Sequence, residues 1–205
     1  MSANISTKED LMQQQILAVA KSLFQVYGLA KVTMDDVAKA MGKGRSSLYY
    51  YYKSKDEIFD AVVMIEIREM LAAMAHAVDL ASGIEQKLRA FFLTKLEVLR
   101  EKRAFFKMLD VGMDADTFSN FQKTKIVHHN LIISQESILL GQLLTEGISK
   151  GELRKMSAAE LDMLILVLLS GLRGLKHELE LEGNSKKVAP AVNMFTHMAM
   201  YGLKH

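Results

Sequence analysis

The amino-acid sequence predicts an all-α protein. The chain has 205 residues and a single proline, and its hydrophobic residues recur at intervals of three and four. Proline interrupts helices, so its near absence permits long ones, and this spacing places apolar side chains on one helical face. Cysteine is absent, which excludes disulfide bonds and cysteine-ligated metal sites. No apolar run is long enough to span a bilayer and no signal peptide is recognisable, so we expect a cytoplasmic protein.

The first 82 residues of the chain contain signals for four helices. Two of them open with a threonine followed three residues later by an aspartate, a pair that can cap the first helical turn reciprocally. Gly28 and Gly42 follow the ends of these two helices, as glycine commonly does. The four helices are expected at residues 7–28, 33–41, 45–52 and 54–82.

Helical periodicity continues beyond Gly83, with no strand-like alternation and no internal repeat. Five further helices are expected at residues 84–101, 103–114, 117–150, 157–182 and 186–203. About nine helices therefore make up the expected fold. We predict two domains, residues 1–55 and residues 56–205.

Residues 33–52 form a helix-turn-helix pattern, in which two short helices are joined by a turn that contains Gly42. Ala38 is small where the two helices would cross, and Leu48 is expected to hold the second helix by its apolar side. At about 100° per residue, Leu48 and Tyr52 point inward. Ser46, Ser47 and Tyr50 then point outward and offer hydroxyl groups to the major groove of DNA.

Charge is distributed unevenly along the chain. Residues 1–55 hold eight lysine and arginine residues against four acidic ones, whereas the rest of the chain is mildly acidic. Such an asymmetry is expected if only the N-terminal part meets a polyanion. Thr33 and Ser54-Lys55 begin helices, whose free N–H groups can hold phosphates. The pattern indicates a recognition helix flanked by contacts to the DNA backbone.

The run from Thr33 to Ile58 resembles the DNA-binding segment of the tetracycline-repressor (TetR) family, in which a comparable helix-turn-helix ends in a Leu-Tyr-x-x-Phe-x-x-Lys-like string. The similarity covers residues 8–60. The sequence departs from the usual family pattern at Gly44, where serine or threonine is frequent, at Ser46, where glycine is frequent, and at Tyr52, which replaces phenylalanine.

The resemblance implies a sequence-specific transcriptional regulator, more often a repressor, that a small apolar or amphipathic ligand releases from a palindromic operator. It also implies roles for individual residues. Positions that commonly touch phosphates are Thr33, Tyr49, Tyr51 and Lys55. Positions where bases are commonly read are Lys43, Arg45, Ser46, Ser47 and Tyr50.

The remaining 150 residues are expected to pair subunits and to bind an effector. An apolar stripe and small residues on the last two helices favour a homodimer, because two subunits can read two half-sites. The stripe comprises Leu161, Leu164, Ile165, Leu168, Leu169, Leu172 and Leu175, extended by Val192, Phe195, Met198, Ala199 and Tyr201. An ordinary monomer core is the alternative.

The middle helices are rich in methionine and phenylalanine, which suit both irregular cores and ligand pockets. In the family this region encloses an apolar effector pocket. The resemblance therefore implies ligand contacts by Phe91, Phe92, Phe105, Phe106, Phe121 and His128.

Two other classes of protein stay open at this point: a helical enzyme and a protein-interaction module. Catalytic residues are not expected, because no Ser-His-Asp arrangement or glycine-rich phosphate loop is present. Neither a metal nor another cofactor is expected. Adjacent His128 and His129 would point about 100° apart on a helix, so one partly buried and one solvated histidine is the preferred interpretation.

Overall fold

The structure is a computed structural model that describes residues 2–109 and 111–204, with side chains described between residues 8 and 203. Contacts divide the chain into two compact units. Unit 1 comprises the residues up to Arg68 together with Lys102–His128, and unit 2 comprises Glu69–Glu101 and the residues from His129 onward. All regular secondary structure within the described residues is helical, which confirms the predicted fold class. The predicted domain boundary after residue 55 separates two functions, DNA binding and effector binding, and it stays a prediction.

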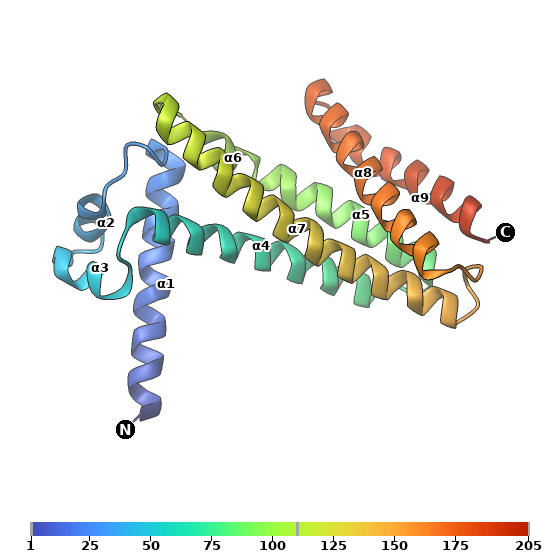
Figure 1. Cartoon of the computed structure of the whole chain (residues 1–205), viewed down its shortest axis with the longest axis horizontal. Coiled ribbons are helices and arrows are strands. Elements are labelled where there is room, and N and C mark those ends of the chain that lie inside the picture. The colour runs from blue at the N-terminus through green and yellow to red at the C-terminus, as the bar shows by residue number, and fades with distance from the viewer. Residues whose placement is uncertain (1, 110, 205) are drawn as a thin grey trace. The chain divides into compact units, whose positions relative to one another are not determined.

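Nine α-helices and one short 3-10 helix occur in the described part of the chain (Figure 1). Helices α4 and α7 each contribute their first part to unit 1 and the remainder to unit 2. The helices are α1 (Ser2–Tyr27), α2 (Met34–Ala40), α3 (Arg45–Tyr51), α4 (Lys55–Leu80), α5 (Ile84–Glu101), α6 (Arg103–Met108), α7 (Ala115–Ser149), α8 (Ala158–Glu182) and α9 (Val188–Lys204), with the 3-10 turn at Ser185–Lys187.

Two predicted boundaries are wrong. Helix α1 already begins at Ser2 rather than at Thr7, because no proline or glycine precedes Thr7 to stop the helix. Helix α6 ends at Met108 rather than near residue 114. Asp114 instead accepts a hydrogen bond from the Thr117 N–H at 2.8 Å, which caps the first turn of α7.

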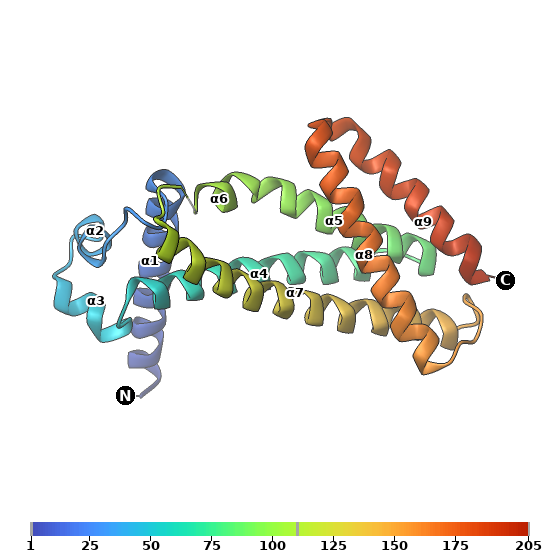
Figure 2. The ribbon, with the colours of Figure 1, turned by 45° about the horizontal axis from the view of Figure 1, so that its top comes forward.

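Apolar side chains of α1 and α4 form the core of unit 1. The buried Phe24 ring of α1 meets Phe59 of α4 edge-on, with ring centroids 6.1 Å apart. Figure 2 shows the short helix α6 beside the end of α1. Glu66 of α4, 2% exposed, pairs with Lys21 of α1 and with Lys102, which precedes α6. This carboxylate therefore joins three segments of unit 1.

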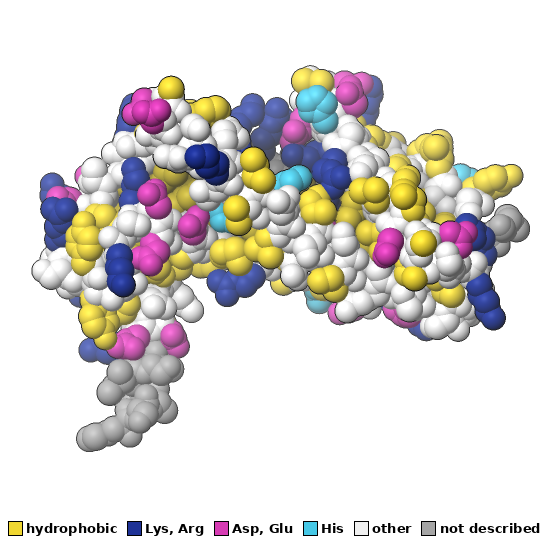
Figure 3. Space-filling model, viewed as in Figure 1, with side chains coloured by type: hydrophobic (Ala, Val, Ile, Leu, Met, Phe, Trp, Pro, Cys, Tyr) yellow, Lys and Arg dark blue, Asp and Glu magenta, His cyan; other side chains and the backbone are white. Residues whose placement is uncertain are grey.

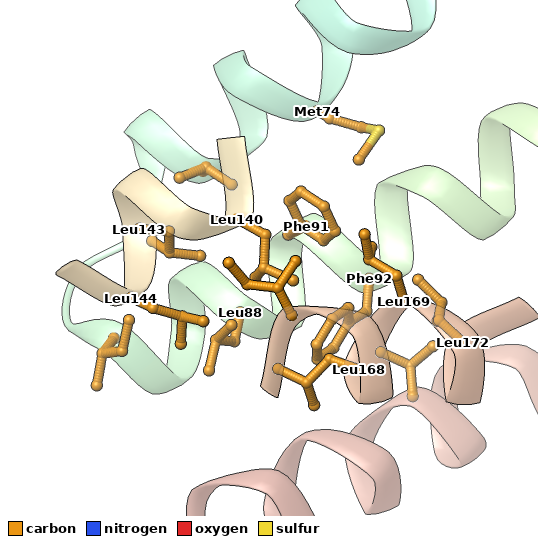
Figure 4. Close-up of a cluster of buried hydrophobic side chains, with 14 of the residues drawn as sticks. Met74, Leu88, Phe91, Phe92, Leu140, Leu143, Leu144, Leu168, Leu169 and Leu172 are labelled. Carbon is orange, nitrogen blue, oxygen red and sulfur yellow. The ribbon is translucent and has the colours of Figure 1, made fainter. Parts of the chain in front are cut away.

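The core of unit 2 is a cluster of aliphatic, phenylalanine and methionine side chains from α4, α5, α7, α8 and α9, part of which Figure 4 shows. Phe91 and Phe92 are fully buried in it and meet edge-on. One ion pair is also buried here, between Lys95 Nζ and Glu136 Oε2 at 2.6 Å. Burial lowers the pKa of Lys95 although the Glu136 carboxylate opposes that shift.

No helix of the described residues combines the length and apolar character needed to cross a lipid bilayer.

Candidate nucleic-acid interface

Thr33 opens α2 with the predicted capping box. Its hydroxyl oxygen accepts from the Asp36 N–H at 3.2 Å, and its own N–H donates to Asp36 Oδ2 at 2.9 Å. The hydroxyl group also donates to Asp36 Oδ2 at 2.6 Å, so Thr33 and Asp36 hold each other from both sides. These bonds lower the pKa of Asp36. The capping box fixes where α2 begins, and Thr33 stays exposed.

The turn between α2 and α3 is built around Gly42. Its φ of +63° lies in the left-handed region, which glycine occupies without steric cost. The Lys43 N–H donates to the Ala38 carbonyl oxygen at 3.0 Å and closes the end of α2. Gly44 then precedes α3 in an extended conformation and supplies no side-chain cap. Both helices and the turn match the predicted helix-turn-helix, which lies beside α1 in Figure 1.

Leu48 is the only buried residue of α3. It is 2% exposed, in agreement with its predicted inward position, and Val37 and Ala38 of α2 are buried as well. Tyr50 lies on the opposite side with 72% of its surface exposed, and Ser46 and Ser47 are exposed too. The outward face of α3 is therefore polar, hydroxyl-rich and open to solvent.

The side chain of Arg45 is engaged by two neighbours. Its Nε and Nη1 atoms lie 3.1 and 3.4 Å from the two carboxylate oxygens of Asp35, and its Nη2 donates to the Tyr49 hydroxyl at 3.2 Å. The guanidinium group also lies over the Tyr49 ring, 5.4 Å from its centroid. The Tyr49 hydroxyl and the Asp35 carboxylate both raise the pKa of Arg45.

Tyr50 reaches back to the first helix. Its hydroxyl group donates to Glu9 Oε1 at 3.2 Å, a contact that spans 41 residues of sequence. This bond and the negative charge of Glu9 raise the pKa of Tyr50. The Tyr50 and Tyr51 rings meet edge-on at 4.9 Å. No sequence signal pointed to Glu9, because α1 and α3 are brought together only by the tertiary fold.

Lys55 stands at the start of α4, where it is half-buried. Its ammonium group donates to the carbonyl oxygens of Leu29 at 2.8 Å and Ala30 at 3.5 Å, in the segment after α1. An ammonium group has three donors, so these two bonds leave one for a phosphate. The sequence pattern did not predict this second role of Lys55.

Tyr52, which was predicted to point inward, lies at the end of α3. Tyr52 is half-buried rather than fully buried, because it follows the last turn of α3 in an extended conformation. Burial and the charge of Glu57 raise its pKa. Glu57 also accepts from the Lys53 N–H at 2.5 Å and helps to fix the chain between α3 and α4. Lys43 is exposed on the turn.

The six residues predicted to contact a ligand fall into both units. Phe91 and Phe92 belong to the core of unit 2, and the other four belong to unit 1. His128 in unit 1 lies 3.5 Å from Asp60 through its Nε2 atom, and burial lowers its pKa. His129 is exposed, so the preferred interpretation of the histidine pair is confirmed. Phe105 and Phe121 are buried, and Phe106 is 37% exposed.

Two cavities of unit 2 are lined by other residues than these six. One of about 870 Å³ lies between the start of α5 and α9, where Arg89 Nε donates to Asn193 Oδ1 at 2.6 Å. The other, of about 430 Å³, lies between α7 and α8 and includes Arg173. Within the described part of the chain, no group of three or more histidine or acidic side chains could hold a metal ion.

The apolar stripe predicted on α8 is partly wrong as a subunit surface. Ile165, Leu168, Leu169 and Leu172 are buried in the core of unit 2. Val192 on α9 is likewise buried. Hydrophobic side chains nevertheless remain on the surface over α8 and α9 (Figure 3). The most exposed are Met163, Leu166, Val167, Leu181, Met194, Met198 and Tyr201.

Comparison with known proteins places the interface in a family. Residues 16–62 match the family model of the bacterial regulatory proteins of the tetR family. The chain is 21% identical to the HTH-type transcriptional regulator SrpR of Pseudomonas putida over 75% of its length, which covers 68% of that relative. It is 25% identical to the HTH-type transcriptional repressor KstR2 of Mycolicibacterium smegmatis, but this match spans only 45% of either chain.

The fold is also similar to solved structures. The TetR family transcriptional regulator PfmR from Thermus thermophilus superimposes with a TM-score of 0.57 and 20% identity, covering 93% of this chain and 99% of that one. Each of these relatives is named as a transcriptional regulator or repressor. Together with the helix-turn-helix geometry, the family match identifies residues 16–62 as a DNA-binding segment of the tetR family of bacterial regulatory proteins.

Proposed function

We propose that the protein is a homodimeric repressor that binds a palindromic DNA operator and leaves it when a small apolar or amphipathic ligand binds. The observation that carries this proposal is the geometry of α3. A single buried leucine anchors the helix, and hydroxyl and cationic side chains cover its exposed face. Such a face is complementary to base edges in the major groove.

Two kinds of contact are proposed within this surface. Phosphate contacts fix the position of the head on the duplex, and base contacts select the sequence. Lys55 favours a phosphate because it adds a positive charge at the start of α4, and Thr33 is exposed at the start of α2. The proposed phosphate set is Thr33, Tyr49, Tyr51 and Lys55, and the proposed base-reading set is Lys43, Arg45, Ser46, Ser47 and Tyr50.

We propose that α8 and α9 form the subunit interface. Exposed Met163, Leu166 and Val167 on α8, together with Met198 and Tyr201 on α9, supply an apolar surface. Exposed apolar patches on soluble proteins commonly mark interaction sites. Gly171 lets α8 pack closely against α9 of the same chain, since a Cβ atom at this position would lie 2.9 Å from the Phe195 ring, so one subunit can present both helices together.

The proposed ligand contacts are the six aromatic residues named from the resemblance: Phe91, Phe92, Phe105, Phe106, Phe121 and His128. Thermal-shift screening with apolar and amphipathic compounds tests this part of the proposal. A true effector is expected to raise the melting temperature and to weaken DNA binding, because it must prefer the DNA-free state. Compounds without either effect would contradict the ligand proposal while leaving DNA binding intact.

Selection of bound fragments from random duplex DNA tests the DNA-binding proposal directly. The expected product is a two-fold symmetric site, because a symmetric dimer presents two copies of α3. On that site, Arg45→Ala is expected to relax the preference at one position in each half-site. Equal loss of affinity on all sequences would contradict the base-reading role of Arg45, and absence of any enriched sequence would contradict operator recognition.

A further inference from the structure

Acidic side chains accept hydrogen bonds from several of the residues that are proposed to contact DNA. Only four acidic residues occur among residues 1–55. Three of them accept bonds from the proposed contact set: Glu9 from Tyr50, Asp35 from Arg45, and Asp36 from Thr33. The fourth, Asp10, is exposed on α1, and no bond to α3 is described for it. Asp36 has a structural role as a cap, which leaves Glu9 and Asp35 to be explained.

Asp35 occupies the same donors that DNA would use. Two nitrogens of Arg45, Nε and Nη1, face the two oxygens of its carboxylate at 3.1 and 3.4 Å. A guanidinium group reads guanine or a phosphate through the same kind of paired N–H groups. Arg45 must therefore leave Asp35 before it can pair with DNA through this edge.

Glu9 stands in the same relation to Tyr50. The Tyr50 hydroxyl group, on the most exposed aromatic side chain of α3, donates to Glu9 Oε1 at 3.2 Å. A phosphate or a base acceptor would compete for that one hydroxyl proton. The negative charge of Glu9 also opposes the approach of a phosphate to this part of the surface.

We propose that Glu9 and Asp35 are intramolecular competitors of DNA, and this proposal rests on the DNA-binding function proposed above. In the DNA-free protein, the Glu9 carboxylate binds the Tyr50 hydroxyl group and the Asp35 carboxylate binds the Arg45 guanidinium group. On unselected duplex, Arg45 stays paired with Asp35 and contributes little. On the operator, a base edge of the right shape displaces the carboxylate. The two acids thereby suppress binding to unselected DNA.

The first test removes Asp35. Asp35→Ala is expected to raise the affinity for a fluorescein-labelled duplex of mixed sequence by about two- to five-fold, the scale of an exposed ion pair. The freed guanidinium group can then neutralise a phosphate. The slope of log affinity against log salt concentration (the salt slope) should therefore steepen by about 0.9. Fluorescence anisotropy at several salt concentrations measures both quantities.

A matched control separates this competition from a mere change in net charge. Asp56 is the second residue of α4 as Asp35 is the second residue of α2, and it is exposed. Asp56→Ala therefore removes a comparable first-turn charge without freeing a proposed contact. The gain from Asp35→Ala should exceed the gain from Asp56→Ala, and it should vanish in an Arg45→Ala background.

A second arm tests Glu9 independently. Glu9→Ala is compared with Asp10→Ala, its exposed neighbour on α1, and the pair is repeated in a Tyr50→Phe background. The proposal predicts that only Glu9→Ala raises the affinity for mixed-sequence duplex, and that Tyr50→Phe abolishes this gain. Melting temperatures of all variants confirm that each protein is folded.

The outcomes separate this proposal from the function on which it rests. Gains that match those of the control variants, or that persist in the Arg45→Ala and Tyr50→Phe backgrounds, would overturn the competition. Failure of the unmodified protein and of every variant to bind any duplex would refute DNA binding itself. Gains confined to the paired acids and cancelled by loss of their partners support the proposal.

Discussion

Lys55 shows how one side chain of the DNA-binding head serves folding and the proposed function together. Its ammonium group holds the carbonyl oxygens of Leu29 and Ala30, which follow α1, while its backbone begins α4. Hydrogen bonds from a charged donor are worth about 1.5–3 kcal/mol. Lys55 therefore ties the chain after α1 to α4 before any DNA is present.

Replacing Lys55 is expected to affect both stability and DNA binding. Lys55→Ala should weaken binding to all duplexes equally, because a phosphate contact carries no sequence information. The slope of log affinity against log salt concentration should fall in magnitude by about 1, because one phosphate contact is lost. It should also lower the melting temperature, because two carbonyl groups lose their partner. Gel-shift titrations and thermal unfolding measure these effects.

Lys186→Ala is the control, since this exposed lysine of unit 2 carries the same charge. A loss confined to one DNA sequence in the Lys55→Ala protein would contradict the phosphate role.

The buried pair of Lys95 and Glu136 gives a pH-dependent prediction. Glu136→Gln leaves a buried ammonium group without a counter-charge, which costs about 3–5 kcal/mol near neutral pH. Because burial lowers the pKa of Lys95 below its ordinary 10.5, the folded variant binds fewer protons than the unfolded chain at alkaline pH. The free energy of unfolding of Glu136→Gln is therefore expected to recover toward that of the unmodified protein as pH rises toward 10.5.

Urea unfolding at several pH values measures this recovery. The exposed pair between Lys187 and Glu182 provides the comparison, since Glu182→Gln should change stability little at any pH. A deficit for Glu136→Gln that does not shrink with rising pH would show that Lys95 is not the source of the cost.

At the scale of helices, the end of α1 closely approaches the last residue of α6 and the segment that follows it. Gly28 ends α1 with a φ of +81°, and a Cβ atom there would lie 3.0 and 3.1 Å from the carbonyl oxygens of Met108 and Val111. Both the conformation and the space disfavour a side chain.

Gly28→Ala is accordingly expected to destabilise the protein by about 1–3 kcal/mol. Gly202→Ala is the matched control, because this glycine of α9 has no neighbour within 4 Å of an added Cβ atom. Alanine favours a helix over glycine, so the control should be neutral or slightly stabilising. Equal unfolding midpoints for the two variants would contradict the steric argument.

Local signals predicted the helix-turn-helix, and non-local contacts decided what was missed. The capping box at Thr33, the turn at Gly42 and the inward position of Leu48 depend only on nearby residues, so the sequence reveals them. The partners of Arg45 and Tyr50 could be identified only from the folded chain, since Glu9 is far from Tyr50 in sequence. No spacing rule predicts such contacts.

The α8 stripe shows a different limit. Apolar spacing finds the hydrophobic residues of a helix, but α8 is apolar around most of its circumference. Ile165, Leu168, Leu169 and Leu172 face the core, while Met163, Leu166 and Val167 stay exposed. Only the tertiary structure distinguishes which apolar side is buried within one chain.

At the scale of the whole molecule, the exposed apolar side of α8 gives the test of the proposed dimer. Val167→Glu places a charge on a side chain that is 57% exposed, so it should disrupt an apolar interface without disturbing the core. Light scattering is expected to show a change from twice the chain mass of 23.0 kDa to a single chain. Affinity for a symmetric operator should fall with it, because one head reads one half-site.

Val127→Glu is the matched control, because this valine of α7 in unit 1 is 65% exposed. It should leave the oligomeric state unchanged. An unchanged mass for Val167→Glu, or the same change in both variants, would exclude this side of α8 as the interface.

That Leu48 is the one buried side chain of α3 has a consequence for how relatives of this protein diverge. The side chains at positions 45, 46, 47, 49 and 50 are exposed, so exchanging them should cost little folding energy compared with replacing Leu48. Mutation can therefore rewrite the preferred DNA sequence one residue at a time while the scaffold persists. Duplicated copies of such a chain could therefore acquire separate DNA targets quickly. Transfer of the exposed residues of another recognition helix to α3 should succeed more often when Leu48 is kept than when it is replaced.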